Sequence, residues 1–140
     1  MPTSIRTEIV IDAPPDAVWN VLTDFASHPA WDPFLTKIEG TPSIGERITV
    51  RFRSGMTIRP VVTTFERPRV LEWFGKLLFS GLFDGRHRFE LVPENGATRL
   101  VHSERFSGML VPLVKKVLRD TERDFAALNA ALKERVEKAA

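Results

Sequence analysis

The sequence predicts an α+β domain in which an antiparallel sheet packs against one long C-terminal helix. Short segments typical of β-strands follow one another from residue 47 to residue 106 with no helical pattern between them, which favours an antiparallel sheet. Apolar residues then recur at steps of three and four positions between Met109 and Val136, which is typical of an amphipathic helix. With 140 residues, the chain suits a single domain over residues 1–140.

The first part of the chain is expected to hold one strand and short helical segments. Isoleucine or threonine stands at every second position from 5 to 11 with charged residues among those between, so residues 3–11 should form a half-buried strand. A pair of prolines ends this strand, and a helix should begin near Pro15 or Asp16. The pair His28–Pro29 is expected to break that helix, leaving at most a short turn over residues 30–34.

Five further strands are expected after residue 36, where the pattern becomes alternating. Turn-forming residues separate them, among them Ser54–Gly55, Pro68 and the segment 93–96 (PENG). The expected strands span residues 47–53, 56–66, 70–76, 86–92 and 98–106. The hydrophobic connection at residues 77–83 is expected to gate a pocket or to fold back onto the sheet, rather than to touch a membrane.

The last predicted element is a helix of roughly 28 residues, which would extend about 42 Å and cross a whole small domain. It should begin near Leu110 or Val111, because Pro112 is tolerated only in the first turn of a helix. A twisted antiparallel sheet can curl around such a helix, and a cavity can then remain between the two. A completely filled core is the alternative, and periodicity alone does not decide between them.

Composition and missing motifs exclude several kinds of chemistry. The chain has no cysteine and no tyrosine, so it has no thiol nucleophile, no thiolate metal site and no phenolic acid. Motifs for nucleotide binding and for a serine nucleophile are missing too, and we expect no cofactor. A net charge of +2 is too small to indicate nucleic acid binding. With neither a signal-peptide pattern nor a membrane-length apolar run, we expect a cytoplasmic protein without stable membrane insertion.

The order of these elements, together with the stretch at residues 13–19 (APPDAVW), resembles the START-like helix-grip superfamily. Within it, the chain is most similar to the polyketide cyclase/dehydrase and lipid-transport family, also called SRPBCC. Further matching stretches lie at residues 22–25 (LTDF), 31–34 (WDPF), 83–89 (FDGRHRF), 98–100 (TRL), 104–108 (ERFSG) and 125–135 (FAALNAALKER). The resemblance covers nearly the whole chain in the right order.

This resemblance implies a curved antiparallel sheet of about seven strands wrapped around the C-terminal helix, with two short helices after the first strand. It also implies a hydrophobic pocket between the sheet and the helix. Members of the superfamily bind lipids, sterols, polyketides or plant metabolites; some are cyclases or dehydratases, and others bind partner proteins. Because one fold hosts all these functions, the resemblance does not choose among them.

Alternation along the last two strands places three titratable residues on the face that should meet the helix. His87 shares its face with apolar residues two positions away, and so do His102 and Glu104. One histidine could act as a general base, with Glu104 as an acid or as the group that orients the imidazole. Alternatively, the three residues form a buried, hydrogen-bonded cluster, and the lack of catalytic motifs favours this role.

No metal site is predicted. His28 and Asp32 stand at helical spacing, but Pro29 is expected to interrupt the pair, and no third ligand is evident. Three arginines that alternate with apolar residues are expected to form a solvated strand face rather than an anion-binding site: Arg47, Arg51 and Arg53.

Aromatic residues supply most of the expected pocket wall, with Trp73 and Phe89 at its centre because both stand in mid-strand at inward positions. The residues expected to bind a ligand are Trp31, Phe34, Phe52, Trp73, Phe79, Phe83, His87, Phe89, His102, Glu104, Phe106, Leu118 and Phe125.

The sequence thus supports three hypotheses for function. The first is binding of a small hydrophobic or amphipathic ligand, lipid-like or polyketide-like, between the sheet and the C-terminal helix. The second is a cyclase or dehydratase that uses acid–base chemistry on the three titratable residues. The third is a protein-interaction module, such as a chaperone ATPase activator, which a filled core with an exposed apolar patch would favour.

Overall fold

The computed structural model describes residues 3–76, 84–109, 111 and 115–139. Its elements are, in order, β1 (Thr3–Ile11), α1 (Pro15–Thr23), the 3₁₀ turn η1 (Phe25–Ser27), α2 (His28–Trp31), β2 (Leu35–Glu39), β3 (Thr49–Phe52), β4 (Thr57–Ile58), β5 (Val61–Glu66), β6 (Val70–Lys76), β7 (Asp84–Glu94), β8 (Ala97–Ser107) and α3 (Lys115–Ala139).

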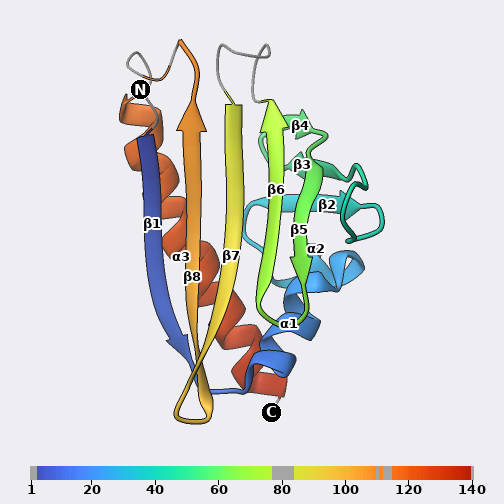
Figure 1. Ribbon diagram of the computed structural model, residues 1–140, viewed down its shortest axis with the longest axis vertical. Coiled ribbons are helices and arrows are strands. Elements are labelled where there is room, and N and C mark those ends of the chain that lie inside the picture. Colours follow the sequence, from blue (N-terminus) through green and yellow to red (C-terminus); the bar gives the residue numbers. More distant parts are fainter. Residues whose placement is uncertain (1–2, 77–83, 110, 112–114, 140) are drawn as a thin grey trace.

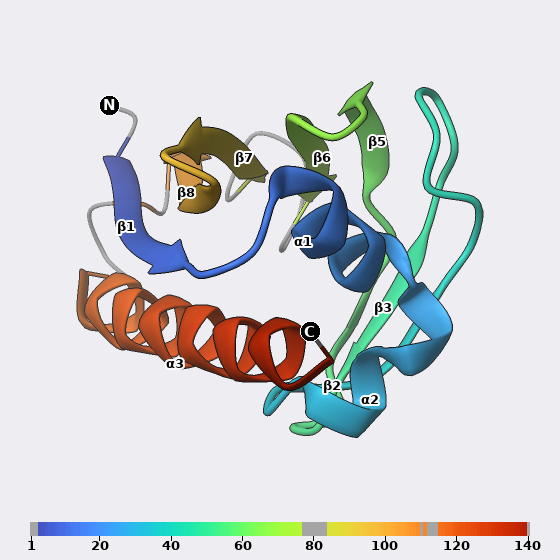
Figure 2. The ribbon, with the colours of Figure 1, turned by 90° about the horizontal axis from the view of Figure 1, so that it is seen from below.

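The strands form two antiparallel sheets, which together with α3 enclose the interior. The larger sheet has the order β1-β8-β7-β6-β5 and the smaller one the order β2-β3-β4. Figure 1 shows α3 crossing behind the larger sheet, and Figure 2 shows β2 and β3 closing the side between β5 and α3. The predicted α+β architecture, an antiparallel sheet system around a long C-terminal helix with short helices after the first strand, is confirmed.

The segment at residues 56–66, predicted as one strand, is divided between the two sheets. β4 ends at Ile58 and β5 begins at Val61, with Pro60 between them. Proline has no N–H for a sheet ladder, and the Pro60 carbonyl instead accepts a hydrogen bond from the N–H of Ile48 at 2.9 Å. The chain therefore passes from the smaller sheet to the larger one at this proline.

Strand β2 is absent from the prediction because its apolar positions do not alternate. Leu35 and Ile38 are its buried residues and stand three positions apart. An irregularity in the pairing with β3, between Leu35 and Lys37, turns both onto the same face. A local bulge of this kind hides the period of two on which the strand prediction depends.

The prediction that Pro29 separates His28 from Asp32 is wrong. Pro29 lies in the first turn of α2, where the missing N–H would have no helical partner in any case. His28 Nδ1 and Asp32 Oδ2 therefore meet at 3.4 Å, and both side chains are buried. Asp32 also accepts the backbone N–H of Phe34 at 2.8 Å through Oδ1, which shapes the turn into β2.

Two apolar clusters flank the interior. The larger one includes Trp19 and Leu22 of α1, Leu100 of the sheet and Leu132 of α3, all almost fully buried. The smaller cluster joins Ile5, Phe106, Val111, Leu118 and Phe125. Helix α3 is described from Lys115 on. Its predicted start near Leu110 or Val111 stays a prediction, because residues 110 and 112–114 lie outside the described part.

Candidate functional site

A cavity of about 590 Å³ lies between the two sheets and α3, and its walls are mostly apolar. Ten of the residues predicted to bind a ligand line it: Phe34, Phe52, Trp73, His87, Phe89, His102, Glu104, Phe106, Leu118 and Phe125. Residues outside that prediction complete the wall, among them Val50 on β3, Ile58 on β4 and Leu128 on α3. Of the two alternatives that the sequence left open, the structure has an internal cavity and not a completely filled core.

Three other predicted site residues are not part of the described wall. Trp31 does not line the cavity, and its ring packs against the imidazole of His28, with the ring centroids 4.7 Å apart. Phe79 and Phe83, together with the rest of the predicted gate at residues 77–83, lie outside the described residues.

The turn between β7 and β8 aligns the polar residues of the wall. Both residues of the Asn–Gly turn at 95–96 have positive φ, 52° and 83°, which these residue types tolerate and which a two-residue hairpin requires. The turn sets the register of the hairpin, in which His87 lies opposite Glu104 and Phe89 opposite His102. Directly opposite side chains on one face are close enough to touch.

Neighbouring strands extend these two rows across the sheet. Trp73 on β6 lies opposite His87, and Thr7 on β1 lies opposite His102. The period of two keeps every member of a row on the face toward α3. Two adjacent rows of aromatic and polar side chains therefore meet the helix.

A continuous chain of hydrogen bonds connects five side chains at this place. Glu104 Oε1 lies 3.1 Å from His87 Nδ1, and His87 Nε2 lies 2.7 Å from His102 Nε2. His102 Nδ1 lies 2.8 Å from Asn129 Oδ1, and Asn129 Nδ2 donates to Thr7 Oγ1 at 2.8 Å. We call these five residues the polar cluster. Its partners satisfy groups that would otherwise be costly to bury.

Aromatic rings hold the two imidazoles of the polar cluster in place. The His102 ring lies between Phe89 and Phe125, stacked on them with centroid distances of 4.3 and 3.9 Å. The His87 ring stacks on Trp73 at 5.1 Å. These contacts fix the planes of both imidazoles and exclude water from His102, which is fully buried.

Burial holds the pKa of His102 well below its usual range, and the neighbouring His87 lowers it further. Hydrogen bonding to Asn129 and to the Phe125 carbonyl opposes this decrease without cancelling it. The imidazole of His102 is therefore uncharged near pH 7.

Lowering the pH should destabilise the fold through His102. Since its pKa in the folded protein lies below the ordinary value of 6.5, the unfolded chain takes up this proton first as the pH falls. The contribution to the free energy of unfolding is complete above about pH 6.5 and decreases below it, by up to about 1.4 kcal/mol per pH unit. Denaturant unfolding between about pH 7.5 and about pH 5 measures this slope.

The variant His102→Gln serves as the control for that slope, since glutamine takes up no proton. Its stability should be lower at every pH, but this part of the pH dependence should disappear. Equal slopes in the two proteins would contradict the assignment.

Arg53 makes contacts that its exposed position does not predict. It is exposed, as predicted, but its guanidinium also donates to the carbonyl oxygens of Pro33 at 3.0 Å, Asp32 at 3.2 Å and Pro29 at 3.4 Å. It therefore braces the turn between α2 and β2 and lines the cavity. Arg51 is exposed, as predicted.

The exposed residues of the wall mark the opening of the cavity. They are Pro33 before β2, Arg53, Ser54 and Met56 on the β3–β4 side, and Asp124 on α3. Burial raises the pKa of Asp124, and the nearby carboxylate of Asp120 adds to this. The opening thus carries both signs of charge, whereas the interior contains the polar cluster.

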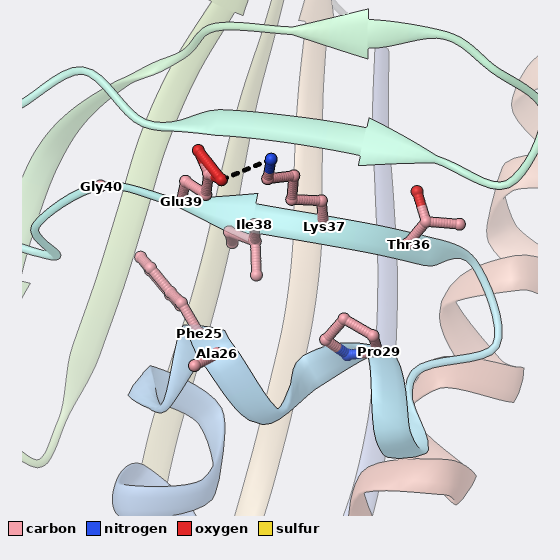
Figure 3. Close-up of a pocket in the computed structure, with 8 residues that line it drawn as sticks. All are labelled: Phe25, Ala26, Pro29, Thr36, Lys37, Ile38, Glu39 and Gly40. Carbon is pink, nitrogen blue, oxygen red and sulfur yellow. Dashed lines mark ion pairs between the residues drawn. The ribbon is translucent and has the colours of Figure 1, made fainter.

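A second, shallower hollow of about 410 Å³ lies between η1, α2 and β2 (Figure 3). Phe25, Pro29 and Ile38 form its apolar part, and the exposed ion pair of Lys37 and Glu39, at 2.6 Å, stands beside them. Because it has no buried polar group, it offers less to a ligand than the larger cavity.

The part of the chain that the structure describes offers neither a metal site nor a membrane span. Nowhere in that part of the chain do three or more histidine, aspartate or glutamate side chains come together to hold a metal ion. Among the described helices, none combines the length and the apolar character needed to span a membrane.

Sequence reasoning missed Asn129 and Thr7 as members of the polar cluster. A signal for Asn129 is present, since it stands four residues after Phe125 and three before Leu132, on the apolar stripe of α3. A polar residue at such a position needs a buried partner, and His102 is that partner. Thr7 shares a face with three isoleucines and gives a weaker signal.

The fold and the cavity together define the class of protein: antiparallel strands that grip a C-terminal helix around an internal cavity form the START-like helix-grip fold. The chain belongs to the family described as polyketide cyclase / dehydrase and lipid transport, whose model matches residues 2–137.

Solved structures share this fold over nearly the whole chain. A protein of Mesorhizobium loti is 20% identical, with a TM-score of 0.82 and 99% of each chain covered. The Zhui aromatase/cyclase from a Streptomyces species is 16% identical, with a TM-score of 0.79, covering 99% of this chain and 95% of that one. A START superfamily protein from Mycobacterium smegmatis is 19% identical, with a TM-score of 0.74 and coverage of 98% and 99%. A comparison with curated proteins finds no match.

Proposed function

We propose that the protein binds a small, largely apolar molecule, lipid-like or polyketide-like, in the cavity between the sheets and α3. The observation that carries this proposal is the cavity itself, about 590 Å³ in volume and lined mostly by apolar and aromatic side chains. Pockets for small molecules typically measure about 300–1,000 Å³ and combine apolar walls with a few polar groups. The family description, which includes lipid transport, agrees with this use.

The two parts of the wall would have different tasks. Aromatic side chains such as Trp73, Phe89 and Phe125 would supply the affinity, since each Å² of apolar surface removed from water contributes about 25 cal/mol. His87 and Glu104, whose side chains keep 14% and 10% exposure, would orient the polar end of the ligand. An open cavity also supports ligand binding over the protein-interaction hypothesis, which relied on a filled core.

Native mass spectrometry of the freshly purified protein tests the proposal. We expect a discrete adduct that is lost on denaturation, and extraction of the bound molecule should identify an apolar compound. If the protein carries no adduct and also fails to bind an apolar fluorescent dye, the proposal is wrong. The dye measurement matters because a weakly held ligand can be lost during purification.

A second candidate function is acid–base catalysis on a polyketide-like substrate. The observation that favours it is the contact between His87 and Glu104, a pair able to give and take a proton at the wall of the cavity. The family description includes cyclases and dehydrases. The variant Glu104→Gln separates the candidates, because an amide can still bind a ligand but cannot transfer a proton. Loss of turnover with binding retained would support the enzyme.

A further inference from the structure

We infer that the cavity selects ligands whose polar group donates a hydrogen bond, that is, an alcohol, a phenol or an amine. The inference rests on the proposed function, since it specifies the chemistry of the molecule in the same cavity. It follows from the direction of each hydrogen bond in the polar cluster.

Thr7 fixes the orientation of the Asn129 amide. The Thr7 hydroxyl has one hydrogen and donates it to the carbonyl oxygen of His102 at 3.0 Å. Its oxygen then only accepts, so the part of Asn129 that faces it at 2.8 Å is the NH₂ group. The amide oxygen of Asn129 is thereby turned toward Nδ1 of His102.

The orientation of this amide determines which ring nitrogens of His102 and His87 carry a hydrogen. An amide oxygen only accepts, so Nδ1 of His102 carries the hydrogen of the neutral ring, and its Nε2 has a lone pair. His87 Nε2, at 2.7 Å, must therefore donate to it. The remaining nitrogen, His87 Nδ1, faces Glu104 Oε1.

One proton lies in the contact between His87 and Glu104. Without it, a lone pair on Nδ1 would face a carboxylate oxygen at 3.1 Å, which is repulsive. The pair is thus either an imidazolium with a carboxylate, or a neutral imidazole that accepts from a carboxylic acid through Oε1. In both states Oε2 of Glu104 has lone pairs and no hydrogen.

Oε2 of Glu104 is the atom that the polar cluster leaves for a ligand. Both ring nitrogens of His87 and both of His102 are used within the cluster. No hydrogen bond joins Oε2 to any residue in the described part of the chain, although Glu104 is buried and lines the cavity. A ligand O–H or N–H satisfies this acceptor, whereas a carbonyl or ether oxygen would place a second acceptor against it.

The test compares 2-naphthol with 2-fluoronaphthalene, which has a similar shape but no hydroxyl hydrogen. Calorimetric titration of the wild-type protein, of Glu104→Met and of Glu104→Gln gives the ratio of the two affinities in each. In Glu104→Met the ratio should shift about tenfold against 2-naphthol, which corresponds to the loss of one hydrogen bond. Glu104→Gln should keep most of the preference, because its NH₂ group can donate to His87 Nδ1 and leave its oxygen facing the cavity.

The outcomes separate this inference from the proposed function. If both compounds bind and the ratio is unchanged in Glu104→Met, the cavity binds ligands but the inference is wrong. If neither compound binds the wild-type protein, the proposed function fails and the inference fails with it. Should Glu104→Met not fold, the wild-type protein decides: 2-naphthol should bind about tenfold more tightly than 2-naphthaldehyde, whose carbonyl only accepts, and equal affinities would overturn the inference.

Discussion

Replacing Asn129 with leucine should lower the free energy of unfolding by about 2–4 kcal/mol. The substitution leaves Nδ1–H of the fully buried His102 without its acceptor, and it removes the donor that faces Thr7. A buried polar group without a partner costs about 1–3 kcal/mol, and two groups are affected. Denaturant unfolding of the wild-type protein and of the variant measures the difference.

Asn20→Leu is the matched control for this measurement. Asn20 is exposed on α1 and accepts one hydrogen bond from Arg67, also exposed, at 2.7 Å. Water replaces that partner, so the stability should change by no more than about 0.5 kcal/mol. If Asn129→Leu proves as mild as the control, the polar cluster does not contribute to stability in the way that its hydrogen bonds indicate.

Replacing Leu128 with tryptophan should abolish ligand binding while the protein remains folded. Leu128 is half-buried on α3 and lines the cavity, so the larger indole would take up the space that a ligand needs. Overpacking a filled core costs about 1–3 kcal/mol, but an empty cavity accepts the added atoms with less strain. We expect the affinity for 2-naphthol to fall more than about a hundredfold, since most of the buried contact area is lost.

Ala127→Trp is the control on the same helix. Ala127 is exposed and is not part of the cavity wall, so a tryptophan there adds the same side chain outside the site. Its affinity for the ligand should equal that of the wild-type protein. Binding that survives in Leu128→Trp would place the ligand somewhere other than this cavity.

Alternation in the sequence was enough to place His87, His102 and Glu104 on the inner face of β7 and β8. The period of a strand is two, so His102 and Glu104 must point the same way as Leu100 and Phe106. The Asn–Gly turn at residues 95–96 adds the register, because a two-residue loop leaves one pairing for the hairpin. Local sequence patterns are thus enough to predict most of this part of the site.

Other parts of the site depend on contacts between segments far apart in the sequence. Asn129 meets His102 only because α3 crosses the sheet at that point, and no local pattern gives the crossing point. The exposed position of Arg53 follows from the sequence, but its hydrogen bonds to three carbonyl oxygens depend on the turn after α2, which the sequence pattern does not give. Trp31 was misplaced for the same reason, since its direction depends on how α2 packs.

A crystal structure of the protein with 2-naphthol would show directly whether the cavity holds the ligand and which atom binds the hydroxyl group. We expect the naphthalene ring inside the cavity between Trp73 and α3, with its hydroxyl oxygen within hydrogen-bond distance of Glu104 Oε2. A ring bound in the shallow hollow beside Phe25 and Ile38 would contradict the proposed binding site, and so would a ring found only on the outer surface.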